Sequence, residues 1–381
     1  MSELNKNTDA DKAVVKANEL RIIIAGGGTG GHVFPAIAIA NAIKKIKPAA
    51  EILFVGAKGK MEMEKVPQAG FTIIGLDIAG FNRSSLFKNF TLPFKILKSL
   101  SQARKVMDDF KPAVVVGVGG YASFPMLRLA QKRNIPTVIQ EQNSYAGKTN
   151  KLLGKKAAKI CVAYDGMGKF FPVNKIIKTG NPVRESIITS TISREEGLKF
   201  FSLDADKKTV LVIGGSLGAK SINEAVNKHI DKLIKNNLQL IWQTGKTFAA
   251  KAAEIAVDHR SVWANDFIMQ MENAYAAADV VVSRAGALAI AELCVVKKPV
   301  LFVPYPYAAE DHQTVNAMSL VKKNAALMVD DNEAIDKIVP MIIELALDEQ
   351  KQNELKRNIA AFSITDADKR IAEEVLLLVK N

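Results

Sequence analysis

Short, nearly continuous apolar runs alternate along the chain with longer segments in which apolar positions recur every three or four residues. In the first half the apolar runs have the length and composition of buried strands. They lie at 21–25, 51–56, 72–76, 113–117, 136–140 and 159–163. The segments between them, for example 33–47 and 89–109, have the periodicity of amphipathic helices. This alternation predicts an α/β fold with parallel sheets that helices cover on both faces.

The alternation of apolar runs and helical segments is interrupted near 180–185 and then resumes. A strand over 209–215 runs into a glycine turn, a helix is expected over 218–235, and three further strands follow. These strands lie at 238–243, 278–283 and 299–304. The same unit is therefore used twice, which predicts two Rossmann-like domains. Amphipathic patterns over 350–360 and 364–380 predict two final helices that can pack on either domain.

Length and composition agree with this picture. The 381 residues suffice for two domains, and 48% hydrophobic with 24% charged residues is typical of a folded globular protein.

Cys161 and Cys294 are too few for a disulfide framework, so a reducing, cytosolic compartment is the simplest interpretation. Residues 1–20 lack an apolar core and are expected to form a flexible extension rather than a signal peptide. No uncharged run reaches the ~20 apolar residues that a bilayer span requires.

The formal net charge is +13, from 52 Lys and Arg against 39 Asp and Glu. Such an excess indicates either an anionic partner, which can be nucleic acid, a phosphorylated substrate or a membrane surface, or solvated charges without a specific role. Aromatic residues make up only 7% of the chain, and no recognised RNA- or DNA-binding motif occurs among the basic residues. We therefore expect no nucleic-acid partner.

The strongest local motif is the glycine-rich run 26–31, which follows the first strand and precedes His32. Glycines let the backbone approach a ligand closely, and the N–H groups of the following helix attract an anion. The run also satisfies G-x-G-x-x-G, but the second strand ends in 54–57 without the acid that a dinucleotide site needs. It therefore favours a phosphate or diphosphate site over a purely structural turn. His32 can serve there as a general base or as a simple phosphate contact.

Two further glycine clusters, 117–120 and 214–218, also follow strands, and ligands bind at the carboxyl ends of strands in open α/β sheets. Three such turns predict a ligand set rich in phosphate. In the second half, Glu292 lies early in the helix that follows Arg284. It is either an ordinary partner of the helix dipole or an acceptor for both hydroxyls of a ribose. Residues 311–316 leave a similar choice between sugar contacts and a solvated helix start.

Eight segments that contain these residues occur in the order found in one enzyme family. They are GGGTGGHVFPA (26–36), VGVGGYASFP (the 117 region), EQNSYAGKTN (141–150), GNPVR (180–184), GGSLGA (214–219), WQTGK (242–246), RAGALAIAE (284–292) and PYPYAAEDHQTVNA (304–317). Each segment is ordinary alone. The ordered set, over about residues 21–380, closely resembles the MurG family of bacterial N-acetylglucosaminyltransferases, which act in peptidoglycan synthesis.

The resemblance implies a GT-B fold, in which two Rossmann-like domains face a central cleft. Residues 21–182, with a C-terminal helix at about 364–381, would bind the acceptor and the membrane, and 183–363 would bind UDP-GlcNAc. The implied reaction moves GlcNAc, with inversion, from UDP-GlcNAc to the 4-hydroxyl of the muramoyl sugar of lipid I and gives lipid II. It needs a base on the acceptor hydroxyl and stabilisation of the departing UDP.

The resemblance also assigns residues to the donor, UDP-GlcNAc. Glu292 would bind the ribose hydroxyls and Ser216 the diphosphate. Gln313 would contact the donor sugar, and Ile268 would meet uracil through its backbone. The other positions expected at the donor are Thr29, Gly30, Gly31, Asn143, Arg184, Ala287, Leu288, Ala289, Ile290 and Ala291.

For the acceptor, the resemblance implies a diphosphate site on the first two glycine clusters, at Gly28, Gly119, Gly120 and Tyr121. His32 is the first candidate for the catalytic base and Glu141 the second. The chain departs from the family pattern at Ala285, where Ser is frequent, and at Gln140, where His is frequent. We expect no metal, because the D-x-D triplets lie outside the motif loops, and no cofactor, because UDP-GlcNAc is a substrate.

Segment 78–98 interleaves aromatic and basic residues, as in a peripheral membrane-binding surface, although an amphipathic helix with buried Phe has the same pattern. The residues expected at the membrane are Phe81, Leu86, Phe87, Phe90, Phe94, Lys88 and Lys95. The resemblance implies a peripheral protein on the cytoplasmic face of the bacterial inner membrane. Its expected partners are UDP-GlcNAc, lipid I, the anionic membrane surface and other proteins of cell-wall synthesis and division.

Two other enzyme classes fit parts of the pattern. A UDP-GlcNAc 2-epimerase shares the architecture but needs no lipid acceptor, so segment 78–98 and the 117–121 loop count against it. A nicotinamide-dependent oxidoreductase would need the acid that is absent after the second strand.

Overall fold

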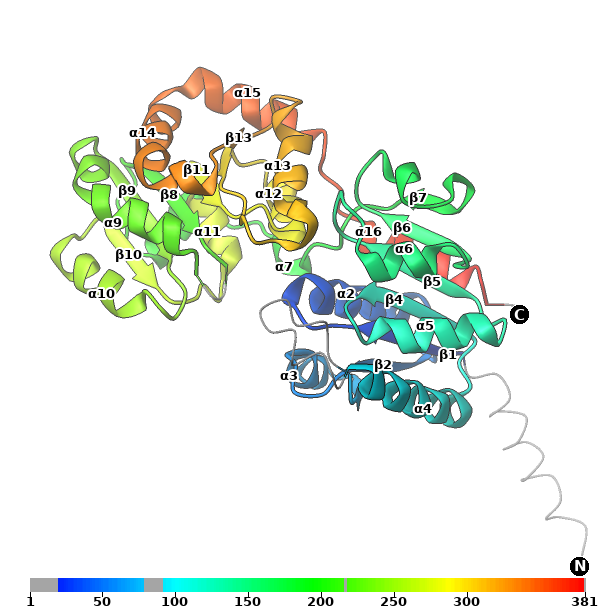
Figure 1. Ribbon diagram of the computed structural model, residues 1–381. Coiled ribbons are helices and arrows are strands. Elements are labelled where there is room, and N and C mark those ends of the chain that lie inside the picture. The colour runs from blue at the N-terminus through cyan, green and yellow to red at the C-terminus, as the bar shows by residue number, and fades with distance from the viewer. Residues whose placement is uncertain (1–19, 79–91, 216–217, 380–381) are drawn as a thin grey trace, which may run out of the picture. The chain divides into compact units, whose positions relative to one another are not determined.

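The computed structural model describes residues 20–78, 92–215 and 218–379 and forms two compact units (Figure 1). The first unit contains the described residues up to Gln142, then Ala146–Pro182 and the C-terminal segment from Asp366. The second contains Asn143–Tyr145 and Val183–Thr365. The chain therefore returns to its first unit at the C-terminus.

The first unit is built on a seven-stranded parallel sheet with the order β3-β2-β1-β4-β5-β6-β7. Its strands are β1 (Arg21–Gly26), β2 (Glu51–Ala57), β3 (Thr72–Leu76), β4 (Val114–Gly119), β5 (Thr137–Glu141), β6 (Lys159–Val162) and β7 (Ile176–Lys178). The direction of winding reverses between β1 and β4. In an open parallel sheet the loops after two such strands diverge, and ligands bind in the crevice that they leave.

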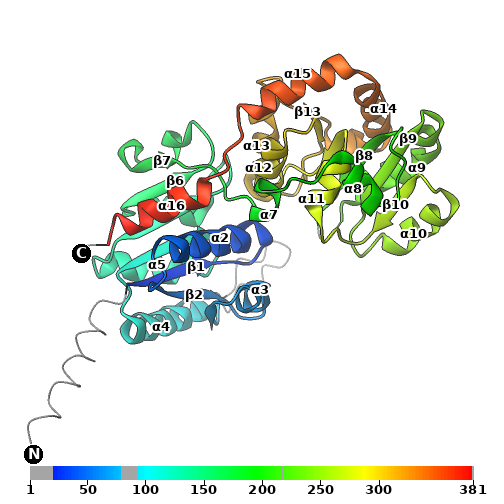
Figure 2. The ribbon, with the colours of Figure 1, turned by 180° about the vertical axis from the view of Figure 1, so that it is seen from behind.

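Helices cover both faces of this sheet, as its nearly continuous apolar strands require. They are α2 (Gly30–Ile46), α3 (Glu62–Gln68), α4 (Leu92–Phe110), α5 (Ser123–Lys132), α6 (Lys148–Gly154) and α16 (Ala367–Leu376). In β1, Ile22 and Ile24 share a core with α2 and α16, whereas Ile23 and Ala25 share one with α4 and α5. Figure 2 shows α2 and α16 side by side on their face.

The second unit has a six-stranded parallel sheet with the order β10-β9-β8-β11-β12-β13. Its strands are β8 (Lys208–Ile213), β9 (Leu238–Gln243), β10 (Val262–Asn265), β11 (Val280–Ser283), β12 (Val300–Phe302) and β13 (Leu327–Met328). Winding again reverses, here between β8 and β11.

The helices of the second unit also lie in two layers (Figure 1). They are α7 (Glu185–Ile188), α8 (Arg194–Phe200), α9 (Lys220–Lys235), α10 (Ala249–Asp258), α11 (Met271–Ala277), α12 (Ala287–Val296), α13 (His312–Val321), α14 (Ala334–Leu347) and α15 (Glu349–Ala360). Helices α8, α11 and α12 share one core with the sheet, and α9 and α14 share the other. Short 3-10 turns complete the chain at Met167–Lys169, Val173–Lys175, Ala309–Asp311 and Asp331–Glu333.

The prediction of two Rossmann-like domains with parallel sheets is confirmed. Every expected strand is present, and the structure adds β7, β10 and β13, which the apolar pattern does not predict. All three lie at the edge of a sheet and are short and partly exposed. An edge strand is covered less completely than a central one, so its sequence needs no continuous apolar run.

Both cysteines lie in the hydrophobic cores, and burial raises the pKa of each thiol, Cys161 and Cys294, to about 12. A thiol of this kind is a poor nucleophile at neutral pH.

Within the described ranges, no helix is both long enough and apolar enough to cross a membrane. In the same part of the chain, no three His, Cys, Asp or Glu side chains gather in a way that could hold a metal ion.

Candidate functional site

The two glycine loops of the first unit meet at its switch point. Strands β1 and β4 are neighbours, and Gly26 pairs with Gly119 after a shift of register between Ala25 and Gly26. The Gly27 N–H donates to the Gly119 carbonyl over 3.2 Å. Gly120 has a φ of +81° and lies so close to the Gly27 carbonyl that any Cβ would overlap it. Two clusters far apart in the sequence therefore form one glycine-lined surface at the carboxyl edge of the sheet.

The imidazole of His32, in the first turn of α2, lies on this surface. Its Nδ1 is 3.0 Å from the Gly27 carbonyl oxygen and 3.2 Å from Thr29 Oγ1. Because a carbonyl oxygen only accepts hydrogen bonds, Nδ1 carries the proton, and in the neutral ring Nε2 holds the basic lone pair. A Cβ on Gly119 would come within 2.8 Å of Nε2, so the ring lies against the second loop. This geometry suits a general base for a ligand held by the loops.

The carboxylate of Glu62 lies beneath the first loop, and no sequence motif singles it out. Glu62 is only 2% exposed, and it accepts from the Gly28 N–H over 2.8 Å and from the Ala57 N–H over 2.9 Å. An acid at the start of a short helix is ordinary, so nothing in the sequence indicates that this side chain turns toward the loop. The Gly28 N–H, expected at the acceptor diphosphate, is thus engaged within the protein.

The other predicted residues of the first unit differ in their surroundings. Tyr121 is 54% exposed in the loop after β4, where the Ser123 hydroxyl donates to the Gly120 carbonyl over 2.8 Å. Glu141, the second candidate base, is buried, and its Oε2 accepts from the Gly147 N–H over 3.0 Å and from the Asn150 side chain over 2.9 Å. These contacts anchor the start of α6, which favours a structural role for Glu141.

The third glycine cluster lies at the matching position of the second sheet. It follows β8, which pairs with β11 at the switch point. The Gly218 N–H donates to the Gly215 carbonyl over 3.0 Å. Gly218 has a φ of +80°, and any Cβ there would overlap the Thr244 carbonyl. Ser216, expected at the donor diphosphate, lies outside the described residues.

Arg184 and Glu292, both expected at the donor, form a bidentate ion pair in the second unit. Arg184 Nε lies 2.7 Å from Glu292 Oε1, and Nη2 lies 2.9 Å from Oε2. The Tyr275 hydroxyl donates to the same Oε2 over 3.1 Å. A carboxylate accepts about four hydrogen bonds, so Glu292 has acceptor capacity beyond these three donors. The structure therefore brings two predicted residues together and adds Tyr275, which lies in no recognised motif.

The Glu292 carboxylate favours the protonated forms of both Arg184 and Tyr275. Burial alone would lower the pKa of Arg184, but the hydrogen bond and the charge of Glu292 outweigh it and raise that pKa. Burial raises the pKa of the Tyr275 hydroxyl well above its usual range, and the charge of Glu292 adds to the effect. Arg184 and Tyr275 therefore keep their protons at neutral pH and remain donors to Glu292.

Other predicted donor residues also have partners inside the second unit. The Ile268 N–H donates to Gln243 Oε1 over 3.1 Å, and the Ile268 side chain lies in the core. A uracil contact through the Ile268 backbone would therefore have to use the carbonyl oxygen. Residues 287–292 form the first turns of α12, directly after its N-cap residue Gly286. Gln313 Oε1 accepts from the Tyr305 N–H over 2.9 Å.

Asn316, in α13, explains why Asn143–Tyr145 belongs to the second unit. The Asn316 side chain is fully buried, and its Oδ1 accepts from the Ser144 N–H over 2.9 Å and from the Ser144 hydroxyl over 2.7 Å. Its Nδ2 donates to Asn143 Oδ1 over 3.2 Å. The structure thus fixes Asn143, another residue expected at the donor, against α13.

The Arg284 guanidinium ties together the carboxyl edge of the second sheet. It donates to the Val303 and Pro304 carbonyls over 3.0 and 3.1 Å. It also donates to the Asp331 carboxylate over 2.5 Å and to the Ser221 hydroxyl over 3.0 Å. These groups follow β12 and β13 or begin α9, so Arg284 orders the loops of this edge.

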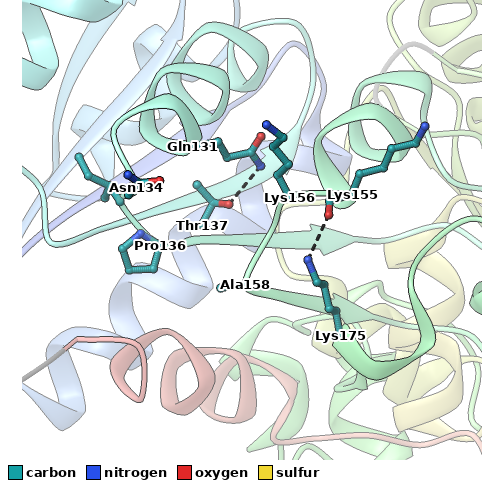
Figure 3. A pocket seen from close by; sticks show the side chains of 9 residues that line it. Gln131, Asn134, Pro136, Thr137, Lys155, Lys156, Ala158 and Lys175 are labelled. Atoms are coloured by element: carbon teal, nitrogen blue, oxygen red, sulfur yellow. Dashed lines mark hydrogen bonds between the residues drawn. The ribbon is translucent and has the colours of Figure 1, made fainter.

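A hollow of about 460 Å³ lies at the opposite edge of the first sheet, near the starts of β5 and β6 (Figure 3). Three lysines line it, and Figure 3 marks two hydrogen bonds among its lining residues. Lys175 Nζ donates to the Lys155 carbonyl over 3.1 Å, and Gln131 donates to the Thr137 hydroxyl over 3.3 Å. Because ligands of open α/β sheets bind at the carboxyl ends of the strands, this hollow is not the candidate site.

Comparison with known proteins covers both units. The glycosyltransferase family 28 N-terminal domain matches residues 22–162, and the C-terminal domain of that family matches residues 209–371. The UDP-N-acetylglucosamine--N-acetylmuramyl-(pentapeptide) pyrophosphoryl-undecaprenol N-acetylglucosamine transferase of Phocaeicola vulgatus is 54% identical over 366 residues, 94% of this chain and 96% of that protein. The protein of the same name from Parabacteroides distasonis is 51% identical over 361 residues, 94% of this chain and 98% of that protein. The crystal structure of Acinetobacter baumannii MurG matches with a TM-score of 0.77 at 27% identity, over 94% of this chain and 99% of that one.

Proposed function

The chain belongs to glycosyltransferase family 28, and from this premise we propose that it is an inverting N-acetylglucosaminyltransferase. It transfers GlcNAc from UDP-GlcNAc to lipid I and so forms lipid II for peptidoglycan synthesis. The acceptor group is the 4-hydroxyl of the muramoyl sugar. In a single in-line displacement this hydroxyl loses its proton as UDP departs, so the enzyme needs a base and anion-binding groups.

The observation that carries the mechanism is the position of His32. Its Nδ1–H donates to the Gly27 carbonyl, which leaves the Nε2 lone pair as the base on a surface made by both glycine loops. The N-terminus of α2 begins at the same place and attracts an anion. A base beside a diphosphate site is what the acceptor reaction requires. Glu141 is the weaker choice, because its carboxylate anchors α6.

We assign the acceptor to residues 21–182 together with the helix at about 364–381. Its diphosphate would lie on Gly119, Gly120 and Tyr121. The exposure of Tyr121 supports this assignment, because its side chain lies at the carboxyl end of β4, where ligands bind in open α/β sheets.

We assign the donor to residues 183–363. Glu292, held by Arg184 and Tyr275, would accept hydrogen bonds from the ribose hydroxyls, and Gln313 would contact the GlcNAc. Ser216 would bind the diphosphate and the Ile268 backbone would meet uracil. Thr29, Gly30 and Gly31 would contact the donor from the first unit. Our other proposed donor contacts are Asn143, Ala287, Leu288, Ala289, Ile290 and Ala291.

The activity is tested by incubating the protein with UDP-GlcNAc and a short-chain, soluble analogue of lipid I. We expect UDP to be released only when the acceptor is present, with one disaccharide product formed per UDP. Because a 2-epimerase needs no acceptor, consumption of UDP-GlcNAc in its absence, with UDP-N-acetylmannosamine as product, would contradict the proposal. The two outcomes are separated by chromatography of the nucleotides and NMR of the sugar.

We propose further that the enzyme works as a peripheral protein on the cytoplasmic face of the inner membrane, where other cell-wall synthesis and division proteins are further candidate partners. Phe81, Leu86, Phe87, Phe90 and Lys88 lie outside the described residues. The described start of α4 supports the proposal, because Phe94 and Leu97 are 71% and 66% exposed beside Lys95 and Lys98. Exposed apolar groups among cations suit an anionic lipid surface.

Replacing both Phe94 and Leu97 with aspartate is expected to lower binding to phosphatidylglycerol vesicles more than tenfold, because a buried large apolar side chain contributes about 1.5–3 kcal/mol. Turnover of the soluble acceptor analogue should stay unchanged. The measurement is vesicle sedimentation in parallel with the UDP-release assay. Val257→Asp, in α10, is the matched control, since Val257 is 84% exposed and lies in the other unit. Equal vesicle binding by the double variant and the control would disprove this membrane surface.

A further inference from the structure

The peptide group between Gly27 and Gly28 is held from both ends by ionisable side chains. Its N–H, on Gly28, donates to Glu62 Oε2 over 2.8 Å. Its carbonyl, on Gly27, accepts from His32 Nδ1, 3.0 Å away. In a trans peptide the N–H and the carbonyl point in opposite directions, and the described chain contains no cis peptide. Glu62 and His32 are therefore joined through one planar, conjugated group.

The position of Glu62 is built into the fold. Its second oxygen accepts from the Ala57 N–H at the end of β2, over 2.9 Å. A Cβ at either Gly27 or Gly56 would overlap the Glu62 side chain, so two glycines make the space that the carboxylate fills. Both carboxylate oxygens are thus used by backbone donors, and β2 and α3 determine where the loop lies.

This arrangement has a chemical consequence for His32. A carboxylate that accepts from a peptide N–H polarises that peptide and increases the negative charge on its carbonyl oxygen, because hydrogen bonds in a chain strengthen one another. A more negative carbonyl holds the Nδ1–H more firmly. It favours the tautomer with the lone pair on Nε2 and stabilises the imidazolium that forms when Nε2 takes a proton. In a Ser-His-Asp triad a carboxylate does this directly.

We propose that Glu62 is a positioning residue that acts on His32 through the Gly27–Gly28 peptide and fixes Nε2 as the basic nitrogen. The inference rests on the proposed function, in which His32 accepts the proton of the acceptor hydroxyl. It adds to that function a charged partner for the base, one supplied by α3 and placed on the far side of the glycine loop.

The tautomer of His32 is measured by NMR of protein labelled with ¹⁵N-histidine. The chain has four histidines, and a His32→Gln variant identifies the His32 signals. In the wild-type protein, at a pH where the ring is neutral, we expect the proton on Nδ1. In Glu62→Gln we expect a mixture of tautomers and a kcat about tenfold lower, the difference between a charge-assisted and a neutral hydrogen bond, with an unchanged KM for UDP-GlcNAc.

Glu64→Gln is the matched control, because Glu64 lies on the same helix but is exposed and pairs with Lys65. It should leave both the tautomer and kcat unchanged. If wild-type His32 carries its proton on Nε2, the proposal is wrong. This measurement needs no variant, so it remains decisive even if Glu62→Gln does not fold. A folded Glu62→Gln protein, judged by circular dichroism and thermal melting, that keeps the wild-type tautomer also overturns it, whatever its kcat. If His32→Ala retains its turnover while the tautomer depends on Glu62, the coupling stands and the assignment of the base fails.

Discussion

Replacing His32 with alanine is expected to lower kcat by about 10²- to 10⁴-fold, the usual contribution of a general base. The affinity for UDP should stay the same, because the lost imidazole acts on the acceptor hydroxyl. The arrangement of Nδ1 against the Gly27 carbonyl gives the reason, since it makes Nε2 the only basic position of the neutral ring. Steady-state kinetics with the soluble acceptor analogue and calorimetry with UDP measure the two quantities.

His259→Ala is the control for this experiment. His259 follows α10 in the second unit and is half-buried, so its replacement shows how much kcat changes when any histidine is truncated to alanine. Its kcat is expected to equal that of the wild type. Near-normal turnover in His32→Ala would make the base assignment wrong, and Glu141→Gln would then be the next variant to measure.

Replacing Glu292 with glutamine is expected to weaken UDP binding about 10- to 100-fold, the effect of losing a hydrogen bond to a charged group. Turnover at saturating donor should change little. The variant should also lose the difference in affinity between UDP and 2′-deoxy-UDP, because the carboxylate is proposed to bind the ribose hydroxyls. Calorimetric titration of both nucleotides into both proteins gives the four dissociation constants.

Glu272→Gln separates ribose recognition from a general change of charge. Glu272 lies close enough to contribute to the raised pKa of Arg184, but it makes no part of the Arg184–Glu292 hydrogen bonding. Its UDP affinity and its preference for the ribonucleotide should match the wild type. If Glu292→Gln retains the wild-type ratio between the two nucleotides, Glu292 does not bind the ribose.

Local patterns suffice for much of the site. The glycine run 26–31 and the position of His32 one residue beyond it place an imidazole at a helix N-terminus on any strand–turn–helix path. Because parallel strands expose their carboxyl ends at one edge, the three glycine clusters are also expected at such edges. The pairing of Gly26 with Gly119 is consistent with this reasoning.

The contacts of Tyr275 and Glu141 lay beyond sequence reasoning. Tyr275 lies in an unremarkable helix, and only the folding of α11 and α12 into one core brings its hydroxyl to Glu292. Glu141 stands in a family motif, but its hydrogen bonds to Gly147 and Asn150 reveal an anchoring role. A side chain's partners depend on how elements pack in three dimensions, and one-dimensional spacing does not encode that.

The sequence alone determined the two-domain α/β architecture, because burial on both faces imposes apolar strands and helical periodicity that can be read position by position. It also determined the enzyme family, because eight short motifs occur in one order. Only the tertiary structure decided what holds the reactive groups. Glu62 reaches the Gly27–Gly28 peptide, and Arg184 reaches Glu292, across long stretches of chain. Hydrogen bonds need donor and acceptor within about 3 Å, and folding alone brings such distant residues so close.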